Sequence, residues 1–319
     1  MKIKIAARLA PFSHTPGSGC LIPGTTLELR AFPTKLTIPQ AGIEHKCQVT
    51  GPVQNFTLQQ DLEKNCVWIF GKGEEGFFRI KVEATDEGFN IGAEHIPYEM
   101  QFVKKTHIER LSLGGHKLQN WDYPQELEDS LPVLFLLGQK IPHIEPFALK
   151  GTASLLQMPT DRNKIASALD ALLKAGFSKI LVPRLFDDQY QGLSPEETID
   201  GNPSILVQEG AKIIRSLFFK QNERRLAFLP TLAPRFHSGR MVSLMADGIG
   251  EIDFEWSKGL LKKAIFRVKT AGDVVLELQK EIKTFRVRKN LKEKGKTQCA
   301  KEPLVLSAGS TYFLDRFKK

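Results

Sequence analysis

Two spacings of apolar residues divide this 319-residue sequence into three parts. Both ends contain short runs in which apolar and polar residues alternate, such as Leu-Glu-Leu-Arg-Ala at 27–31 and Glu-Ile-Asp-Phe-Glu-Trp at 251–256. This period of two predicts strands with one buried face, because successive side chains of a strand point to opposite sides. In the middle, apolar residues recur every three or four positions, which predicts amphipathic helices. The order predicts an α+β chain with β-rich ends and a short helical layer between them.

The N-terminal part, residues 1–103, is predicted to be a β-sandwich-like domain. Clusters of turn-forming residues separate its alternating runs. The runs lie within residues 25–38 and at 55–62, 66–71, 76–84 and 88–92. Pro33 interrupts the first run, as prolines do at a bulge or at the edge of a sheet. Short strands at this spacing are typical of a sandwich.

Residues 104–225 form the predicted helical region. Helical spacing occurs at 123–139 and again at 161–177. A third helix is expected to begin with Asn202 as its N-cap and Pro203 as its first residue, since both residue types favour these positions.

The C-terminal part, residues 226–319, returns to a period of two and is predicted to be a second β-sandwich-like domain. Much of the net charge of +9 lies in one stretch, 280–296. There Lys and Arg alternate with apolar residues before a Lys/Glu/Gly loop, which predicts a strand with one solvated face and an exposed hairpin. Nucleic-acid binding is an alternative reading, but such surfaces usually add aromatic platforms, and only Phe285 qualifies. We expect only weak, strongly salt-dependent binding to nucleic acid.

The composition also argues against several classes of protein. The most apolar run, at 131–138, is too short to span a membrane, and the first residues are too charged for a signal-peptide core. We therefore expect a cytoplasmic protein without a membrane partner. The four cysteines have no metal-ligand spacing, so we expect reduced thiols and no metal site. No Gly-rich phosphate loop is present, and no cofactor is expected.

Four short strings in the last 120 or so residues follow the order found in one enzyme family. They are Asp-Gly-Asn at 200–202, Leu-Pro-Thr-Leu-Ala-Pro at 229–234, Ser-Gly at 238–239 and Glu-Ile-Asp-Phe-Glu-Trp at 251–256. In these strings the chain resembles glycoside hydrolase family ninety-five, the inverting alpha-L-fucosidases. The similar region is the end of their catalytic module and the β-domain that follows it.

The resemblance implies a carbohydrate ligand and helices arranged as an α/α toroid. The family's toroid has twelve helices, which need more than roughly 180 residues, so the shorter segment 104–225 is expected to form an incomplete toroid. The resemblance also implies that Asp200 is the base that activates water and that Asn202 binds sugar hydroxyls. The same string, followed by proline, is typical of a helix N-cap, so a capping role for Asp200 stays open.

Inversion of a glycosidic bond requires a second carboxyl group as the general acid. Glu126, Glu128 and Glu145 are the carboxylates of the helical part that could serve. The first two are equally well explained as partners of the dipole at the start of a helix. The sequence therefore predicts no complete catalytic pair.

His116 and Trp121 form the second group of candidate sugar ligands. A tryptophan ring can stack on a sugar, and the neighbouring histidine and amides can donate hydrogen bonds. The alternative is that Trp121 packs where the sheet meets the helices.

The function expected from these observations is that of a hydrolase-derived protein that binds carbohydrate or an assembly partner. An active inverting glycosidase that completes its cleft as a homo-oligomer, with Asp200 as base, is the first alternative. A basic nucleic-acid-binding protein is the second.

Overall fold

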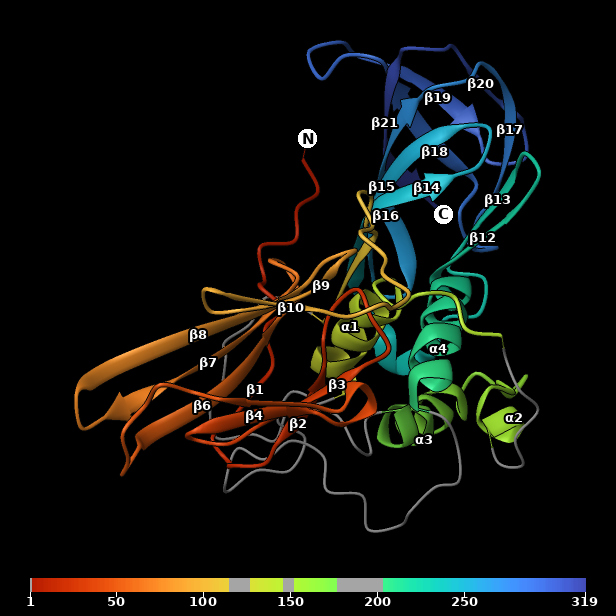
Figure 1. The fold of residues 1–319 in the computed structure, drawn as a ribbon. Coiled ribbons are helices and arrows are strands. Elements are labelled where there is room, and N and C mark those ends of the chain that lie inside the picture. The colour runs from red at the N-terminus through yellow and green to blue at the C-terminus, as the bar shows by residue number, and fades with distance from the viewer. Residues whose placement is uncertain (1, 115–126, 146–151, 177–202) are drawn as a thin grey trace.

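The computed structural model describes residues 2–114, 127–145, 152–176 and 203–319. Two β-rich parts lie on either side of a group of helices (Figure 1). This arrangement confirms the predicted α+β class with sandwich-like sheets at both ends. No helix in these residues is both long and apolar enough to cross a membrane.

The N-terminal sandwich consists of a six-stranded and a four-stranded antiparallel sheet. In spatial order the larger sheet contains β1 (Phe12–Ser13), β6 (Gln54–Asp61), β7 (Cys66–Gly73), β8 (Gly76–Ala84), β9 (Gly88–Ile91) and β10 (Glu94–Pro97). The smaller sheet contains β2 (Gly19–Leu21), β3 (Glu28–Ala31), β4 (Lys35–Ile38) and β5 (Ile43–Lys46), with the turn η1 (Pro39–Ala41) before β5. Pro33 lies in the connection between β3 and β4, where its missing amide hydrogen breaks no ladder bond.

The inner faces of these two sheets enclose a core of alternating apolar residues, as the period of two predicts. Leu58, Ile69 and Val82 of the larger sheet join Leu29 and Leu36 of the smaller one, and all five are fully buried. The residues between them on the larger sheet therefore point to its outer face.

Four helices of the described residues lie between the two β-rich parts. They are α1 (Leu127–Gly138), α2 (Thr152–Leu155), α3 (Ile165–Gly176) and α4 (Pro203–Phe218). The prediction that Pro203 is the first residue of a helix is confirmed. Helices α1 and α4 meet closely at Gly138, where an added Cβ would lie 2.3 Å from the Val207 carbonyl oxygen and 2.6 Å from the Ala211 Cβ. Only glycine permits this approach, which fixes α4 against α1.

The C-terminal sandwich also consists of two sheets. The seven-stranded sheet contains, in spatial order, β11 (Arg110–Leu113), β14 (Gly239–Ala246), β15 (Gly250–Ser257), β16 (Leu260–Val268), β21 (Thr311–Lys318), β18 (Thr284–Arg288) and β19 (Lys296–Cys299). The four-stranded sheet contains β12 (Phe219–Asn222), β13 (Arg225–Phe228), β17 (Gly272–Glu277) and β20 (Leu304–Leu306). A short turn, η2 (Pro234–Phe236), precedes β14.

Strands from within the predicted helical region 104–225 take part in this C-terminal sandwich. Strand β11 pairs with β14, and the hairpin β12–β13 continues directly from the end of α4. One buried core runs from the helices into both sheets and includes Leu134 of α1, Leu172 of α3, Phe228 of β13 and Phe254 of β15. The helices and the C-terminal sandwich thus share a single core.

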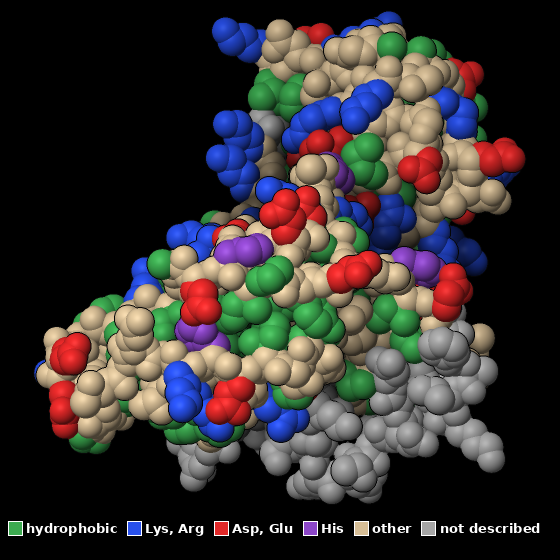
Figure 2. Space-filling view, viewed as in Figure 1, with side chains coloured by type: hydrophobic (Ala, Val, Ile, Leu, Met, Phe, Trp, Pro, Cys, Tyr) green, Lys and Arg blue, Asp and Glu red, His purple; other side chains and the backbone are tan. Residues whose placement is uncertain are grey.

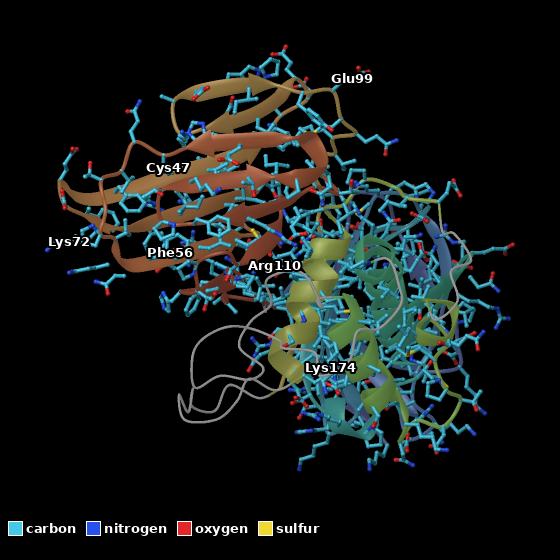
Figure 3. The ribbon with its side chains drawn as sticks, turned by 60° about the horizontal axis from the view of Figure 1, so that its bottom comes forward. Cys47, Phe56, Lys72, Glu99, Arg110 and Lys174 are labelled. Atoms are coloured by element: carbon cyan, nitrogen blue, oxygen red, sulfur yellow. The ribbon has the colours of Figure 1, made fainter. Side chains whose placement is uncertain are left out.

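Polar contacts join the N-terminal sandwich to this unit. Arg110 of β11 donates to Glu63, at 2.8 Å, and lies beside α1 in Figure 3. Just after α1, the buried Lys140 donates to the Asn65 side chain, and its carbonyl oxygen accepts the Gly24 N–H at 2.9 Å. These contacts tie the β6–β7 turn and the β2–β3 connection of the N-terminal sandwich to β11 and to the end of α1.

Candidate functional site

The four residues to which the sequence assigns catalytic or sugar-binding roles lie outside the described part of the chain. They are Asp200, Asn202, His116 and Trp121. Their roles therefore stay predictions. The described residues present two other surfaces on which aromatic or cationic side chains gather.

Two of the three candidate general acids are among the described residues. Glu145 is exposed to solvent beside His143, which is not the dry setting that a general acid needs. Glu128 accepts hydrogen bonds from Arg235, at 2.6 and 2.9 Å, and so ties α1 to η2. Glu126 lies outside the described residues.

The first surface is the outer face of the six-stranded sheet, which we call the aromatic face. It carries four aromatic side chains from three strands: Phe12, Trp68, Phe70 and Phe77. The strand register brings them to one side, because Phe12 lies opposite Gln59, which in turn lies opposite Trp68. Lys72, two residues after Phe70, lies opposite Phe77. The Phe77 side chain is 71% exposed, and the other three are half-buried.

Cationic and amide groups lie between these rings. The Arg79 guanidinium carbon is 3.7 Å from the centre of the Trp68 ring, a stacked cation–π contact. The Phe70 and Phe77 rings are 6.3 Å apart, within the range of an aromatic pair. Lys81, opposite Trp68, also lies on this side of the sheet, where its ammonium group pairs with the Glu83 carboxylate. The aromatic face therefore combines apolar ring surfaces with hydrogen-bond donors.

The second surface is a hollow of about 600 Å³ where α4 runs into the β12–β13 hairpin, and we call it the Arg215 hollow. Its charged lining residues are Lys212, Arg215, Lys220, Arg225 and Glu277. Four of these five are cationic. A smaller hollow of about 370 Å³ shares Arg215 with it.

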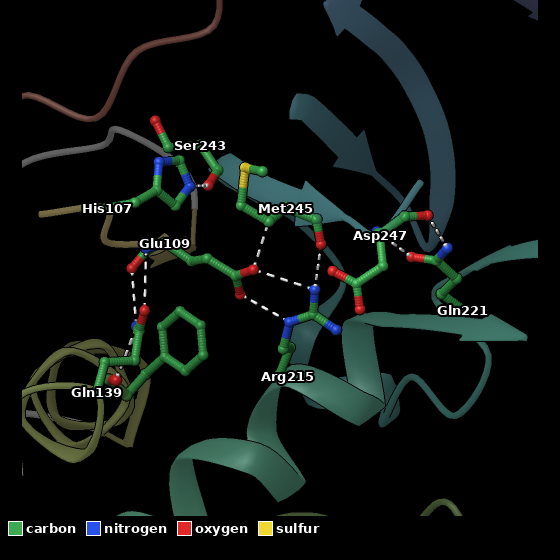
Figure 4. A network of polar contacts seen from close by, with 9 residues as sticks. His107, Glu109, Gln139, Arg215, Gln221, Ser243, Met245 and Asp247 are labelled. Atoms are coloured by element: carbon green, nitrogen blue, oxygen red, sulfur yellow. Dashed lines mark hydrogen bonds and ion pairs between the residues drawn. The ribbon is translucent and has the colours of Figure 1, made fainter. Parts of the chain in front are cut away.

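A network of hydrogen bonds fixes the guanidinium of Arg215 (Figure 4). Its Nε donates to Glu109 Oε2 at 2.8 Å, and its Nη2 donates to Glu109 Oε1 at 3.0 Å and to the Met245 carbonyl oxygen at 2.7 Å. Glu109 is buried, and its Oε1 also accepts the Met245 N–H at 3.0 Å. The backbone of Glu109 is held as well. The Gln139 side chain accepts the Glu109 N–H and donates to the Glu109 carbonyl oxygen.

A bulge in β14 explains why the backbone of Met245 is free for these contacts. The register between β14 and β15 shifts between Met241 and Leu244, and Ser243 has a φ of 58°. The Ser243 N–H donates to Asp253, at 2.8 Å, and β11 pairs with β14 only as far as residue 242. Glu109 and Arg215 therefore bind backbone groups of Met245 that lie beyond the β11 pairing.

The basic stretch at 280–296 forms the strand and exposed hairpin that its pattern predicts. Strands β18 and β19 pair across a solvent-exposed loop. Phe285 is fully buried and stacks on Phe317, with ring centres 5.5 Å apart, so it offers no platform for a base. On the face shown in Figure 2, acidic and uncharged side chains interrupt the Lys and Arg side chains of this sandwich.

Within the described ranges, no group of three or more His, Cys, Asp or Glu side chains could hold a metal ion. The four cysteines are free thiols, and Cys20, Cys47 and Cys66 are buried.

The sequence matches no protein-family model, and the comparison with curated proteins gives no match either.

Proposed function

We propose that this protein binds carbohydrate through the aromatic face of its N-terminal sandwich. The observation that carries the proposal is the register of β1, β6, β7 and β8, which gathers four aromatic side chains on one solvent-facing side of a sheet. These rings lie outside the sandwich core, and Phe77, at 71% exposed, presents the most apolar surface to a ligand, whereas Arg79 covers one face of Trp68.

The chemistry of the aromatic face suits a sugar better than a purely apolar partner. A pyranose presents C–H groups on its ring faces and hydroxyls around its rim, so it needs flat apolar surface next to hydrogen-bond donors and acceptors. Phe70 and Phe77 offer the apolar surface, and Arg79, Gln59 and Lys81 offer polar groups beside it.

The resemblance to family ninety-five adds a second part to the proposal. In it, α1 to α4 are the remainder of an incomplete α/α toroid. Asn202, His116 and Trp121 are further sugar contacts, Asp200 stands at the position of the family's base, and binding occurs without turnover. The free thiols fit a reducing compartment, so we place the protein in the cytoplasm.

Affinity gel electrophoresis with a panel of neutral and acidic polysaccharides tests the proposal. Fully burying a Phe side chain contributes about 1.5–3 kcal/mol. A sugar that covers part of Phe77 would gain about 1 kcal/mol, so Phe77→Ala is expected to weaken binding about fivefold. The double variant Phe70→Ala/Phe77→Ala is expected to weaken binding more than Phe77→Ala does, by a factor that need not be the product of the two single effects because the rings are in contact.

The matched control is Val305→Ala, which removes an apolar side chain that is 65% exposed on the C-terminal sandwich. It should migrate as the unaltered protein does in every gel. The proposal fails if no polysaccharide retards the protein, or if the control loses retardation as much as Phe77→Ala.

A further inference from the structure

We infer that the Arg215 hollow binds the phosphate group of a small molecule. The hollow, at about 600 Å³, has the size of a small-molecule site. Among its charged lining residues, Lys212, Arg215, Lys220 and Arg225 outnumber the single acid, Glu277. A compact dianion matches such a set better than a neutral or cationic ligand does.

One helical stripe supplies part of this lining. Counted from Lys212, the lining residues Arg215, Ser216 and Phe219 follow at three, four and seven positions. This spacing places them along one side of α4, with Phe219 directly after its last residue. Lys220 and Arg225 approach from the β12–β13 hairpin. The cations therefore converge from two elements that the chain joins without a loop.

The Arg215 guanidinium is oriented before any ligand binds. Glu109 and the Met245 carbonyl occupy its Nε and Nη2, and Nη1 has no hydrogen-bond partner among the described residues. The side chain is 32% exposed, so this free edge can reach a ligand. A donor already held in place loses little conformational entropy when it binds an anion.

The other cations are free or only weakly engaged. Lys220 has no ion pair in the described part of the chain, and Arg225 contacts Glu277 at 3.5 Å, with both side chains more than half exposed. Lys212 contacts Glu209 at 2.6 Å, and its side chain is 59% exposed. Exposed pairs of this kind contribute little, so a phosphate group can compete for the cations.

The end of α4 does not oppose an anion strongly. The last carbonyl groups of a helix carry partial negative charge when they are unpaired. Here the Leu217 and Phe218 carbonyl oxygens accept the Thr231 and Leu229 N–H groups at 3.4 and 2.8 Å.

The adjoining smaller hollow has a different balance of charge. Glu223 and Asp247 there offset Arg215 and Arg224. We therefore place the phosphate group in the larger hollow, on the side of Lys220 and Arg225.

Isothermal titration calorimetry with inorganic phosphate tests the inference. The titration is done at neutral pH and at low ionic strength, because salt screens exposed charges. A titration with chloride at the same ionic strength gives the baseline. We expect saturable binding with a dissociation constant on the order of 1 mM. The double variant Lys220→Gln/Arg225→Gln should bind at least about tenfold more weakly, and Lys212→Gln should weaken binding by a smaller factor.

The matched control is Lys269→Gln/Lys318→Gln, which removes the same charge from exposed positions away from the hollow. It should leave the affinity for phosphate within about twofold of the unaltered protein. The inference is overturned if the protein shows no saturable binding, if the hollow variants bind as tightly as the parent, or if the control loses as much affinity as they do. Circular dichroism of each variant checks that the fold is kept.

Discussion

Replacing Glu109 by alanine tests whether the Glu109–Arg215 pair holds α4 to the C-terminal sandwich. Glu109 accepts two hydrogen bonds from Arg215 and one from the Met245 N–H. Its removal leaves the guanidinium with only the Met245 carbonyl as a described partner and leaves the Met245 N–H without an acceptor.

The expected cost follows from the burial of the two partners. Breaking a fully buried ion pair costs about 3–5 kcal/mol. The Glu109 side chain is 11% exposed but that of Arg215 is 32% exposed, so water can reach the guanidinium, and we reduce this part to about 2 kcal/mol. The unpaired Met245 N–H adds about 1 kcal/mol. A total of about 3 kcal/mol lowers the thermal midpoint of a unit of this size by about 6–12 °C.

Differential scanning calorimetry measures this shift, with near-ultraviolet circular dichroism as a probe of tertiary structure. Glu109→Gln keeps an acceptor for Met245 and should cost about half as much. The matched control is Glu255→Ala, because Glu255 also contacts two cations, Lys263 at 3.2 Å and Arg240 at 3.4 Å, but its side chain is 23% exposed against 11% for Glu109. Its midpoint should move by no more than the equivalent of about 1 kcal/mol. A midpoint for Glu109→Ala within the error of this control would refute the reasoning.

Two further predictions concern titratable groups. Burial raises the pKa of Asp315, but hydrogen bonds and charge from Arg286 and Arg288 lower it by more. The pKa therefore lies below its ordinary value of 3.8. The stabilisation is therefore complete above pH 3.8 and is lost as the pH falls through the lower folded-state pKa. Urea midpoints measured from pH 6 downward should fall more steeply for the unaltered protein than for Asp315→Asn, and parallel curves would contradict this. Burial also raises the pKa of the Cys66 thiol to about 11, so a disulfide reagent at pH 8 should modify the half-buried Cys299 quickly and Cys66 only after unfolding, as mass spectrometry can show.

The strands with one buried face were predictable because their period of two is local. The run at 76–84 is β8, and the string at 251–256 lies within β15. Strands β11, β12 and β13 could not be predicted in the same way. Each has only four residues, too few to show a period, and β11 pairs with a strand that follows all the helices.

The two candidate surfaces differ in how far the sequence reveals them. Trp68 and Phe70 are two residues apart in a predicted strand, so the sequence places both on one side. That this side faces outward, and that Phe12 and Phe77 join it, depends on strand register. The Arg215 hollow depends on the angle between α4 and the β12–β13 hairpin and on Glu109, an isolated acid in the sequence. The predicted residues Asp200, Asn202, His116 and Trp121 lie outside the described part of the chain.

Strand β11 imposes an order on how the chain can fold as it leaves the ribosome. Residues up to Val103 can form the N-terminal sandwich early, because all strands of its two sheets have been synthesised by then. Strand β11 emerges next, but its partner β14 begins only at Gly239. At about 5–20 residues per second, β11 waits for at least roughly six seconds with an unpaired edge. Its Arg110 can bind Glu63 of the finished sandwich during that interval, which keeps the edge close to the folded part of the nascent chain.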